Sequence, residues 1–229
     1  MSWSVLAFAV WPYVALTMFV VGHIWRWRTD KFGLTTRTSE ICEKKWLLWA
    51  SPTFHVGLLM VILGHGLGLL VPPAATAAIG VPEHVYHLVA TIAGVIAGCV
   101  LVVGIVLLIL RRFIMKTRLR LVTRPGDIVM YILLACVVTL GMWTTFSQTV
   151  FGSFDYRESV SVWFRSIFYA NPAVDLMASA PLLFQIHAIV AFGLFAVWPF
   201  SRLVHLWSAP VGYLTRPLIV YRPPVSAVS

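Results

Sequence analysis

Charged residues are scarce in this chain, and their scarcity excludes most soluble folds. Asp, Glu, Lys and Arg make up 11% of its 229 residues, against about 25% in an ordinary soluble domain. Hydrophobic residues make up 60%, and the mean hydropathy is +0.89. The net charge is +9, but the basic residues lie in short segments between apolar runs. No basic face is left for a nucleic acid, so we expect no nucleic-acid partner.

Cysteine is also rare. The chain contains Cys42, Cys99 and Cys136, an odd number with no CxxC spacing. This pattern predicts neither a disulfide nor a cysteine-based zinc or iron–sulfur site. Cys99 and Cys136 fall in apolar runs, where we expect them to pack as small residues, and Cys42 falls in a basic segment.

Five apolar runs are long enough to cross a bilayer. They cover residues 3–25, 46–71, 84–110, 128–148 and 182–207. The first is too long for a cleaved signal and lacks a basic start, so we expect it to remain as a span. The connection 149–181 contains an aromatic stretch, 160–169, that is expected to lie at the membrane interface. We predict an all-α integral membrane protein, with residues 1–229 forming one five-helix domain.

The basic residues predict the orientation of these spans. Fifteen of the 17 Lys and Arg residues lie in the first connection, the third connection or the C-terminal part. Only Arg157 and Arg165 lie elsewhere. Basic connections stay in the cytoplasm, so the N-terminus is predicted to lie outside and the C-terminus in the cytoplasm.

Four histidines inside apolar runs are the candidate functional residues. His55 and His65 lie in the second run, and His187 and His205 lie in the fifth. An ionisable residue inside a span is costly without a partner, which makes it a functional hypothesis. The two runs cross in opposite directions, so His55 pairs with His205 near the cytoplasm and His65 with His187 near the outside. We interpret each pair as the axial ligands of one haem.

Other interpretations of these histidines fit less well. Zinc would need a nearby cysteine or carboxylate and a proton path would need carboxylates, and the runs contain no carboxylate. A haem-free anchor, with the histidines joining helices, is the alternative. Straight helices would separate His55 from His65 by about 15 Å and His187 from His205 by about 27 Å. We therefore expect tilting or a bend at Pro199. Eighteen residues are five helical turns, which predicts a common face for His187 and His205.

Small and basic residues surround the histidines. Gly64 and Gly68, with Gly66, flank His65 and would let a flat macrocycle approach the helix, although small residues also serve helix packing. Arg202 precedes His205 by three residues and would share its face. Arg111 and Arg112 end the third run at the same level. All three arginines are candidate partners of haem propionates, with membrane anchoring as the preferred alternative for Arg112.

Four segments carry a resemblance to a known family. They are TFHVGLLMVILGHGLGLL (53–70), GIVLLILRRF (104–113), TRPGDI (123–128) and, the most specific, WPFSRLVHLWSAPVGYLTRP (198–217). On these segments the chain resembles the haem-b membrane subunit, or gamma chain, of respiratory nitrate reductase. The resemblance covers nearly the whole chain, including its length and its five spans.

This resemblance implies two haems b held by His55, His65, His187 and His205 in a bacterial inner membrane. It implies oxidation of menaquinol or ubiquinol near the outer haem. Electrons would then reach the inner haem, a cytoplasmic iron–sulfur beta subunit and a molybdenum alpha subunit. Nitrate reduction would belong to the partner, so no catalytic residue is expected here.

The family's quinol site is associated with a lysine at the start of the third span. This chain has no lysine there and reads His84-Val85-Tyr86-His87, so Tyr86 or His87 would supply the polar contact to quinol. A related diheme subunit that serves a heterodisulfide- or sulfite-type reductase is the alternative. Only the closing segment, 198–217, favours nitrate reductase.

Overall fold

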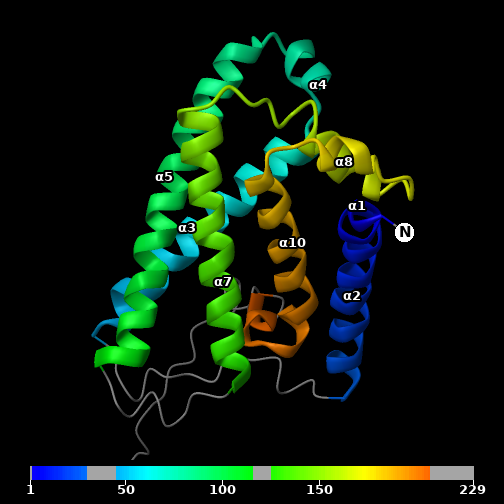
Figure 1. Ribbon diagram of the computed structural model, residues 1–229. Helices are drawn as coiled ribbons and strands as arrows, with labels where there is room; N and C mark the ends of the chain where they lie inside the picture. The colour runs from blue at the N-terminus through cyan, green and yellow to red at the C-terminus, as the bar shows by residue number, and fades with distance from the viewer. Residues whose placement is uncertain (1, 30–44, 116–124, 207–229) are drawn as a thin grey trace, which may run out of the picture.

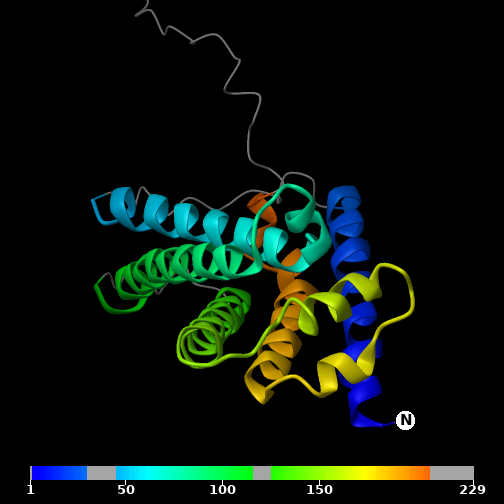
Figure 2. The same cartoon turned by 90° about the horizontal axis from the view of Figure 1, so that it is seen from above.

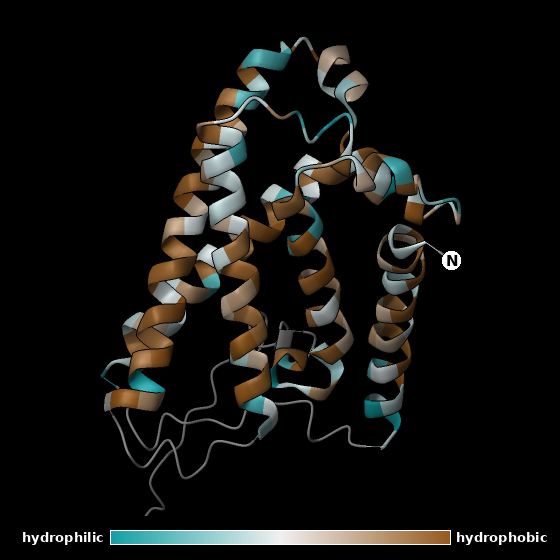
Figure 3. Ribbon diagram, in the orientation of Figure 1, coloured by the Kyte–Doolittle hydropathy of each residue, from teal (hydrophilic) through white to brown (hydrophobic). Residues whose placement is uncertain are grey.

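The computed structural model describes residues 2–29, 45–115 and 125–206, and every regular element in these ranges is helical. Five helices are long and apolar enough to cross a membrane, which confirms the predicted architecture (Figure 1). They cover Trp3–Thr29, Leu47–Leu70, Glu83–Ile114, Pro125–Val150 and Leu182–Phe200. Apolar residues dominate along the helices, and many of the polar residues lie near their ends (Figure 3).

The spans are built from the following elements. The first contains α1 (Trp3–Val5), the π-helical turn η1 (Leu6–Val10) and α2 (Trp11–Thr29). The second is α3 (Leu47–Leu70), the third is α5 (Glu83–Ile109) with η3 (Leu110–Met115), and the fourth is α7 (Pro125–Thr144) with η4 (Thr145–Val150). Short helices α4 (Pro73–Ala78), α8 (Val160–Ile167) and α9 (Val174–Ala178) lie between spans. The fifth span contains α10 (Leu182–Val197) and η5 (Trp198–Phe200), and η6 (Arg202–Leu206) follows it.

Two predicted span ends and one predicted connection differ from the structure. The first span continues through Arg26 and Arg28 to Thr29, and the third runs past Arg111 and Arg112 to Ile114. Arginine does not end a helix, because its long side chain can carry the charge away from the helix axis. The segment predicted as a loop before Glu83 contains α4, which begins at Pro73 because proline is pre-organised for a first helical turn.

The fifth span is the main correction. It was predicted as one helix to residue 207, but α10 ends at Val197. Pro199 has no N–H to continue the helix, and the chain passes through η5 and an extended Ser201 (φ −110°, ψ −178°) into the 3₁₀ helix η6. His187 and His205 therefore lie on different elements, and the five-turn argument for a common face is wrong.

The helices follow one another across the bundle in the order α3, α5, α7, α10 and α2 (Figure 2). The α3–α5 contact is the closest, because glycines let the backbones meet. A Cβ atom at Gly57 would lie 2.5 Å from the backbone nitrogen of Leu101, and one at Gly104 would collide with the backbone of Phe54.

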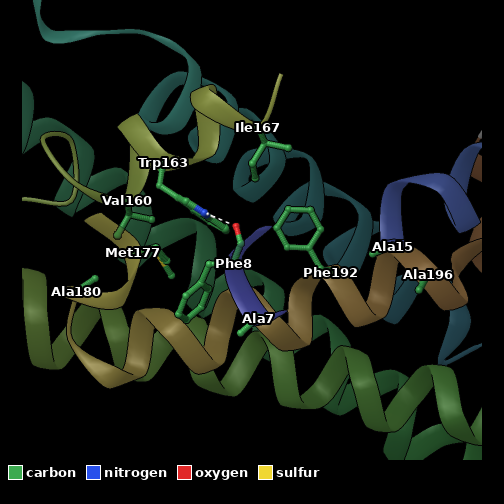
Figure 4. Close-up of a cluster of buried hydrophobic side chains, with 10 residues drawn as sticks. All are labelled: Ala7, Phe8, Ala15, Val160, Trp163, Ile167, Met177, Ala180, Phe192 and Ala196. Carbon is green, nitrogen blue, oxygen red and sulfur yellow. Dashed lines mark hydrogen bonds between the residues drawn. The ribbon is translucent and has the colours of Figure 1, made fainter. Parts of the chain in front are cut away.

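Two apolar clusters fill the bundle. One joins Phe54 of α3, Leu101 of α5, Leu134 of α7 and Leu194 of α10. The other joins the first span to α8, α9 and α10, and there Trp163 Nε1 donates a hydrogen bond to the carbonyl of Phe8 at 2.8 Å (Figure 4). The predicted interfacial stretch is thus the helix α8, with one side buried against the bundle.

The two ends of the bundle carry different elements. The basic end is the end at which Arg26, Arg111, Arg112 and η6 lie. The α8 end is the opposite end, which carries α4, α8, α9 and the N-terminus (Figure 1).

Candidate functional site

The structure brings the four histidines together in the two pairs expected from their depths. At the basic end, Nε2 of His55 on α3 lies 3.4 Å from Nε2 of His205 on η6, with ring centroids 5.8 Å apart. Nearer the α8 end, the rings of His65 on α3 and His187 on α10 lie 6.2 Å apart with 33° between their planes. α3 therefore supplies one imidazole to each pair.

Backbone carbonyls orient three of these imidazoles in the same way. Nδ1 lies 2.7 Å from the carbonyl oxygen of Ser51 in His55, 2.8 Å from that of Val61 in His65, and 2.6 Å from that of Arg202 in His205. An Nδ1–H that donates to a carbonyl leaves the Nε2 lone pair free, the arrangement found in histidine metal ligands. The Nδ1 atom of His187 is buried and finds no hydrogen-bond partner among the described residues.

Both pairs fit the axial donors of a haem. Two metal–imidazole bonds of about 2 Å place the Nε2 atoms about 4 Å apart and the ring centres about 6 Å apart. The measured 3.4 Å and the centroid distances of 5.8 and 6.2 Å are close to these values. The helix surface beside His65 is open, since a Cβ at Gly64 or Gly66 would meet no atom within 4 Å.

A buried ion cluster lies beside the histidines of the basic end. Asp127, at the start of α7, accepts hydrogen bonds from Arg202 Nε at 2.6 Å and from Arg112 Nη2 at 3.2 Å. Asp127 is 5% exposed and Arg112 is 3% exposed. We call Arg112, Asp127 and Arg202 the Asp127 cluster. Arg112 is therefore part of a buried ion pair, a contact that membrane anchoring alone does not require.

The Asp127 cluster holds the segment that carries His205. Arg202 is bound to Asp127 through its side chain and to His205 Nδ1 through its carbonyl oxygen. Arg26 of α2 adds a second support, because its Nη1 donates to the carbonyl of Pro199 at 2.9 Å. That carbonyl lies where the helix is broken and would otherwise need a partner. Side chains from three other spans thus fix the chain around His205.

Comparison with known proteins identifies the family. The nitrate reductase gamma subunit family matches residues 4–224. The chain belongs to this family. It is 43% identical over 222 residues to the nitrate reductase gamma chain of Bacillus subtilis, covering 97% of this chain and 99% of that one. It is 32% identical over 211 residues to the respiratory nitrate reductase 1 gamma chain of Escherichia coli, covering 91% and 92%.

A further relative is longer. The nitrate reductase-like protein NarX of Mycobacterium tuberculosis is 48% identical over 221 residues, which are 95% of this chain and 33% of that protein. The chain thus spans about a third of the length of this relative. Family membership and the five apolar helices make the chain a multi-pass bacterial membrane protein of the gamma-subunit family.

The residues predicted to contact quinol lie in a polar network at the α8 end of this gamma-family chain. Arg157 is fully buried, stacks 3.7 Å above the ring of Tyr86 and donates to Glu83 Oε1 at 2.6 Å. Tyr86 also shares a hydrogen bond with Tyr156, and burial raises the pKa of the Tyr156 phenol. A Cβ at Gly68 would lie 3.2 Å from the Tyr156 hydroxyl, so this predicted haem neighbour faces Tyr156.

Sequence reasoning missed three residues of these sites. Gly141 of α7 lies against His187, and a Cβ there would be 3.1 Å from the imidazole Cε1. The other two are Asp127, a carboxylate in the first turn of α7, and Arg157, which was counted only as a basic residue of a connection. A charged residue at the edge of an apolar run was the available signal for Asp127, whereas nothing in the sequence distinguishes Gly141 from other glycines in spans.

Some predictions concern residues with little or no described structure. Cys42, Arg216, Arg222 and the rest of 207–229 lie outside the described residues. Cys99 and Cys136 were expected to pack inside the bundle, but both are exposed on its surface. In membrane helices such a surface can face lipid, where a small, weakly polar thiol is tolerated.

Proposed function

We propose that the chain is the quinol-oxidising diheme cytochrome b subunit of respiratory nitrate reductase. The observation that carries the proposal is the pair of imidazole couples, which face each other at two levels: His55 of α3 with His205 of η6, and His65 of α3 with His187 of α10. Membership of the gamma-subunit family supports nitrate reductase over a heterodisulfide- or sulfite-type partner.

The chain's own residues would hold and orient the cofactors. His55 with His205, and His65 with His187, would supply the axial nitrogens, and the Nδ1 contacts to Ser51, Val61 and Arg202 would keep Nε2 unprotonated. Haem b supplies a one-electron carrier at each level when bound. Gly64 would leave room for the haem beside His65. Gly68 would leave less room, because Tyr156 faces it.

Propionates of the inner haem would meet the basic end. The Asp127 cluster brings the guanidinium groups of Arg112 and Arg202 to this end of the bundle. Arg202 lies beside His205, and Arg111 is 2% exposed at the same end. A propionate brought to Arg111, Arg112 or Arg202 would find a charge-assisted partner there.

The direction of transfer follows from the charge distribution. The basic end would face the cytoplasm by the positive-inside rule, and quinol would react at the α8 end near Tyr86 and His87. Protons would be released outside, and electrons would pass to the iron–sulfur beta and molybdenum alpha subunits docked at the basic end. The reaction separates charge because the two histidine levels lie toward opposite faces.

An optical experiment on the purified chain tests the two-haem assignment. The reduced protein should show a b-type spectrum with two haems per chain. His205→Ala should remove one haem and leave the His65/His187 haem at least partly in place, while His187→Ala should do the reverse. His84→Ala is the matched control, since His84 is exposed at the start of α5.

Two results would reject the proposal. One is a colourless wild-type protein, which would favour the haem-free anchor. The other is an unchanged haem content in both ligand variants. Loss of one haem in His84→Ala would instead move the assignment away from the paired histidines.

A further inference from the structure

Three metal-ligating side chains meet at the surface of the α8 end. Glu83 and His87 lie one turn apart at the start of α5, and Asp155 comes from the connection between η4 and α8. Their ligand atoms all lie within 4.8 Å of one another. His87 Nε2 is 3.3 Å from Glu83 Oε1 and 3.4 Å from Asp155 Oδ2. This group is separate from the four paired histidines.

The two distances from His87 Nε2 match the distance between two ligand atoms of a tetrahedral metal ion. Zinc binds histidine nitrogen and carboxylate oxygen at about 2.0–2.2 Å in tetrahedral geometry, so two of its ligand atoms lie about 3.3–3.5 Å apart. Both distances from His87 Nε2 fall at this edge length. One imidazole with two carboxylates is also a donor set that zinc accepts, with a water as the fourth ligand.

Neighbouring bonds hold both carboxylates in place. The backbone N–H of Arg157 donates to Asp155 Oδ1 at 2.8 Å, which leaves Oδ2 directed at His87. The Arg157 guanidinium donates to Glu83 Oε1 at 2.6 Å, and Arg157 is itself fully buried and stacked on Tyr86. A rigid, buried arginine thus orients the two acidic ligands, as outer partners of metal ligands do.

Charge and access also suit a cation. The carboxylates of Glu83 and Asp155 outnumber the single guanidinium of Arg157 here, so a divalent ion would find an excess of acidic side chains. The side chains of Glu83, His87 and Asp155 are 44%, 30% and 37% exposed. An ion can therefore reach the group from water without opening the bundle.

We propose that Glu83, His87 and Asp155 form a binding site for a divalent transition-metal ion, with zinc as the best match. The bound ion links the first turn of α5 to the segment before α8 and stabilises the polar network around Arg157. The site does not depend on haem binding, and its His87 is also one of the residues near which quinol is proposed to react.

Metal binding to the full-length chain in lipid nanodiscs tests this proposal. After chelator treatment and its removal, Zn²⁺ is titrated in competition with a chromogenic chelator, and Co²⁺ is used as an optical probe of geometry. We expect one site per chain, the intense visible bands of tetrahedral Co²⁺, and a higher unfolding temperature with Zn²⁺. His87→Gln and Asp155→Asn should each weaken the affinity at least about tenfold, because each removes a ligand.

His84→Gln is the matched control, since it removes an exposed histidine three residues from His87 and should leave the affinity unchanged. The proposal is overturned if wild type shows no stoichiometric site, if Co²⁺ gives only a weak octahedral spectrum, or if His84→Gln weakens binding as much as His87→Gln. If a variant does not fold, the Co²⁺ spectrum and the Zn²⁺-dependent unfolding temperature of wild type still decide the question.

Discussion

The two histidine pairs are positioned by different means. His187 belongs to the regular helix α10, and its imidazole rests against Gly141 of the neighbouring helix. His205 lies on a 3₁₀ segment after a helix break, and it is held through Arg202, Asp127 and Arg112. Packing fixes the first imidazole, and a chain of charged hydrogen bonds fixes the second.

The difference follows from the backbone. A regular helix satisfies its own N–H and C=O groups, so a side chain on it needs only a complementary neighbour. Where a helix is broken, some backbone carbonyls lack a hydrogen-bond partner, and the helix no longer fixes the direction of the chain. Side chains must then supply the missing hydrogen bonds. Charged side chains cost less near the membrane surface than at the centre of the bilayer, and the basic end lies near that surface. Substitutions at the two sites should therefore have separable effects.

The largest effect is expected from Asp127→Ala. Two guanidinium groups would lose their shared carboxylate in a buried site, and removing one partner of a buried ion pair costs about 3–5 kcal/mol. We expect a lower unfolding temperature and, if the chain binds haem as proposed, a loss of the haem at His55 and His205 before the haem at His65 and His187. Thermal unfolding and the reduced optical spectrum measure both.

Asp175→Ala is the control for Asp127→Ala, because Asp175 is an exposed carboxylate on α9. Equal loss of both haems in Asp127→Ala would mean that the Asp127 cluster supports the whole bundle and not His205 in particular.

A smaller effect is expected from Gly141→Ala. The added methyl group would lie 3.1 Å from Cε1 of His187, so the imidazole would have to move by a few tenths of an ångström. The displaced imidazole should lower occupancy at the His65/His187 pair and leave the other pair unchanged. Haem content per chain and its redox titration measure this split.

Gly94→Ala on α5 is the control for Gly141→Ala, since a Cβ there meets no atom within 4 Å. If Gly141→Ala keeps both haems with wild-type potentials, contact with α7 does not position His187.

The smallest effect is expected in the pH dependence of folding stability, and it involves Tyr156 at the α8 end. Burial, and the neighbouring Tyr86, raise the pKa of Tyr156 above its ordinary value of 10.0. An unfolded chain ionises this phenol as the pH passes 10, while the folded chain keeps the proton, so folding stability falls above that pH. Tyr156→Phe should make this alkaline loss less steep.

Unfolding measured from pH 8 to pH 11 checks the Tyr156 prediction. Tyr169→Phe controls for the loss of a phenol, because Tyr169 is 80% exposed. An unchanged alkaline slope in Tyr156→Phe would show that the buried phenol does not contribute to it.

The spans and the meeting of the histidines could be predicted because they depend on local quantities. Hydrophobic length gives the spans, and the positions of His55, His65, His187 and His205 along opposite-running helices give the levels. Pro199 was recognised as a bend, but whether a proline bends or ends a helix depends on what satisfies the carbonyls that follow the break. The partner of the Pro199 carbonyl, Arg26, lies 173 residues away in the chain.

The remaining contacts could not be predicted for the same reason. Asp127 meets Arg202 across 75 residues and Arg112 across 15, and Glu83 meets Arg157 across 74. Charge counting placed Arg112 and Arg202 on the basic side and Arg157 in the long connection, but it did not consider Asp127 or Glu83. Their pairing depends on how the helices pack, which hydrophobic periodicity does not specify when every face of a helix is apolar.

The bond from Arg26 to Pro199 has a consequence for how the polypeptide is made. Gly22 allows the two segments to touch, since a Cβ there would lie 2.8 Å from Pro199 Cβ. Of these two spans, the one that precedes in the chain leaves the ribosome first and later contacts the kink of the other. The segment around Pro199 can therefore acquire its finished shape only after meeting a helix that was made well before it, so the insertion of these two spans is coupled.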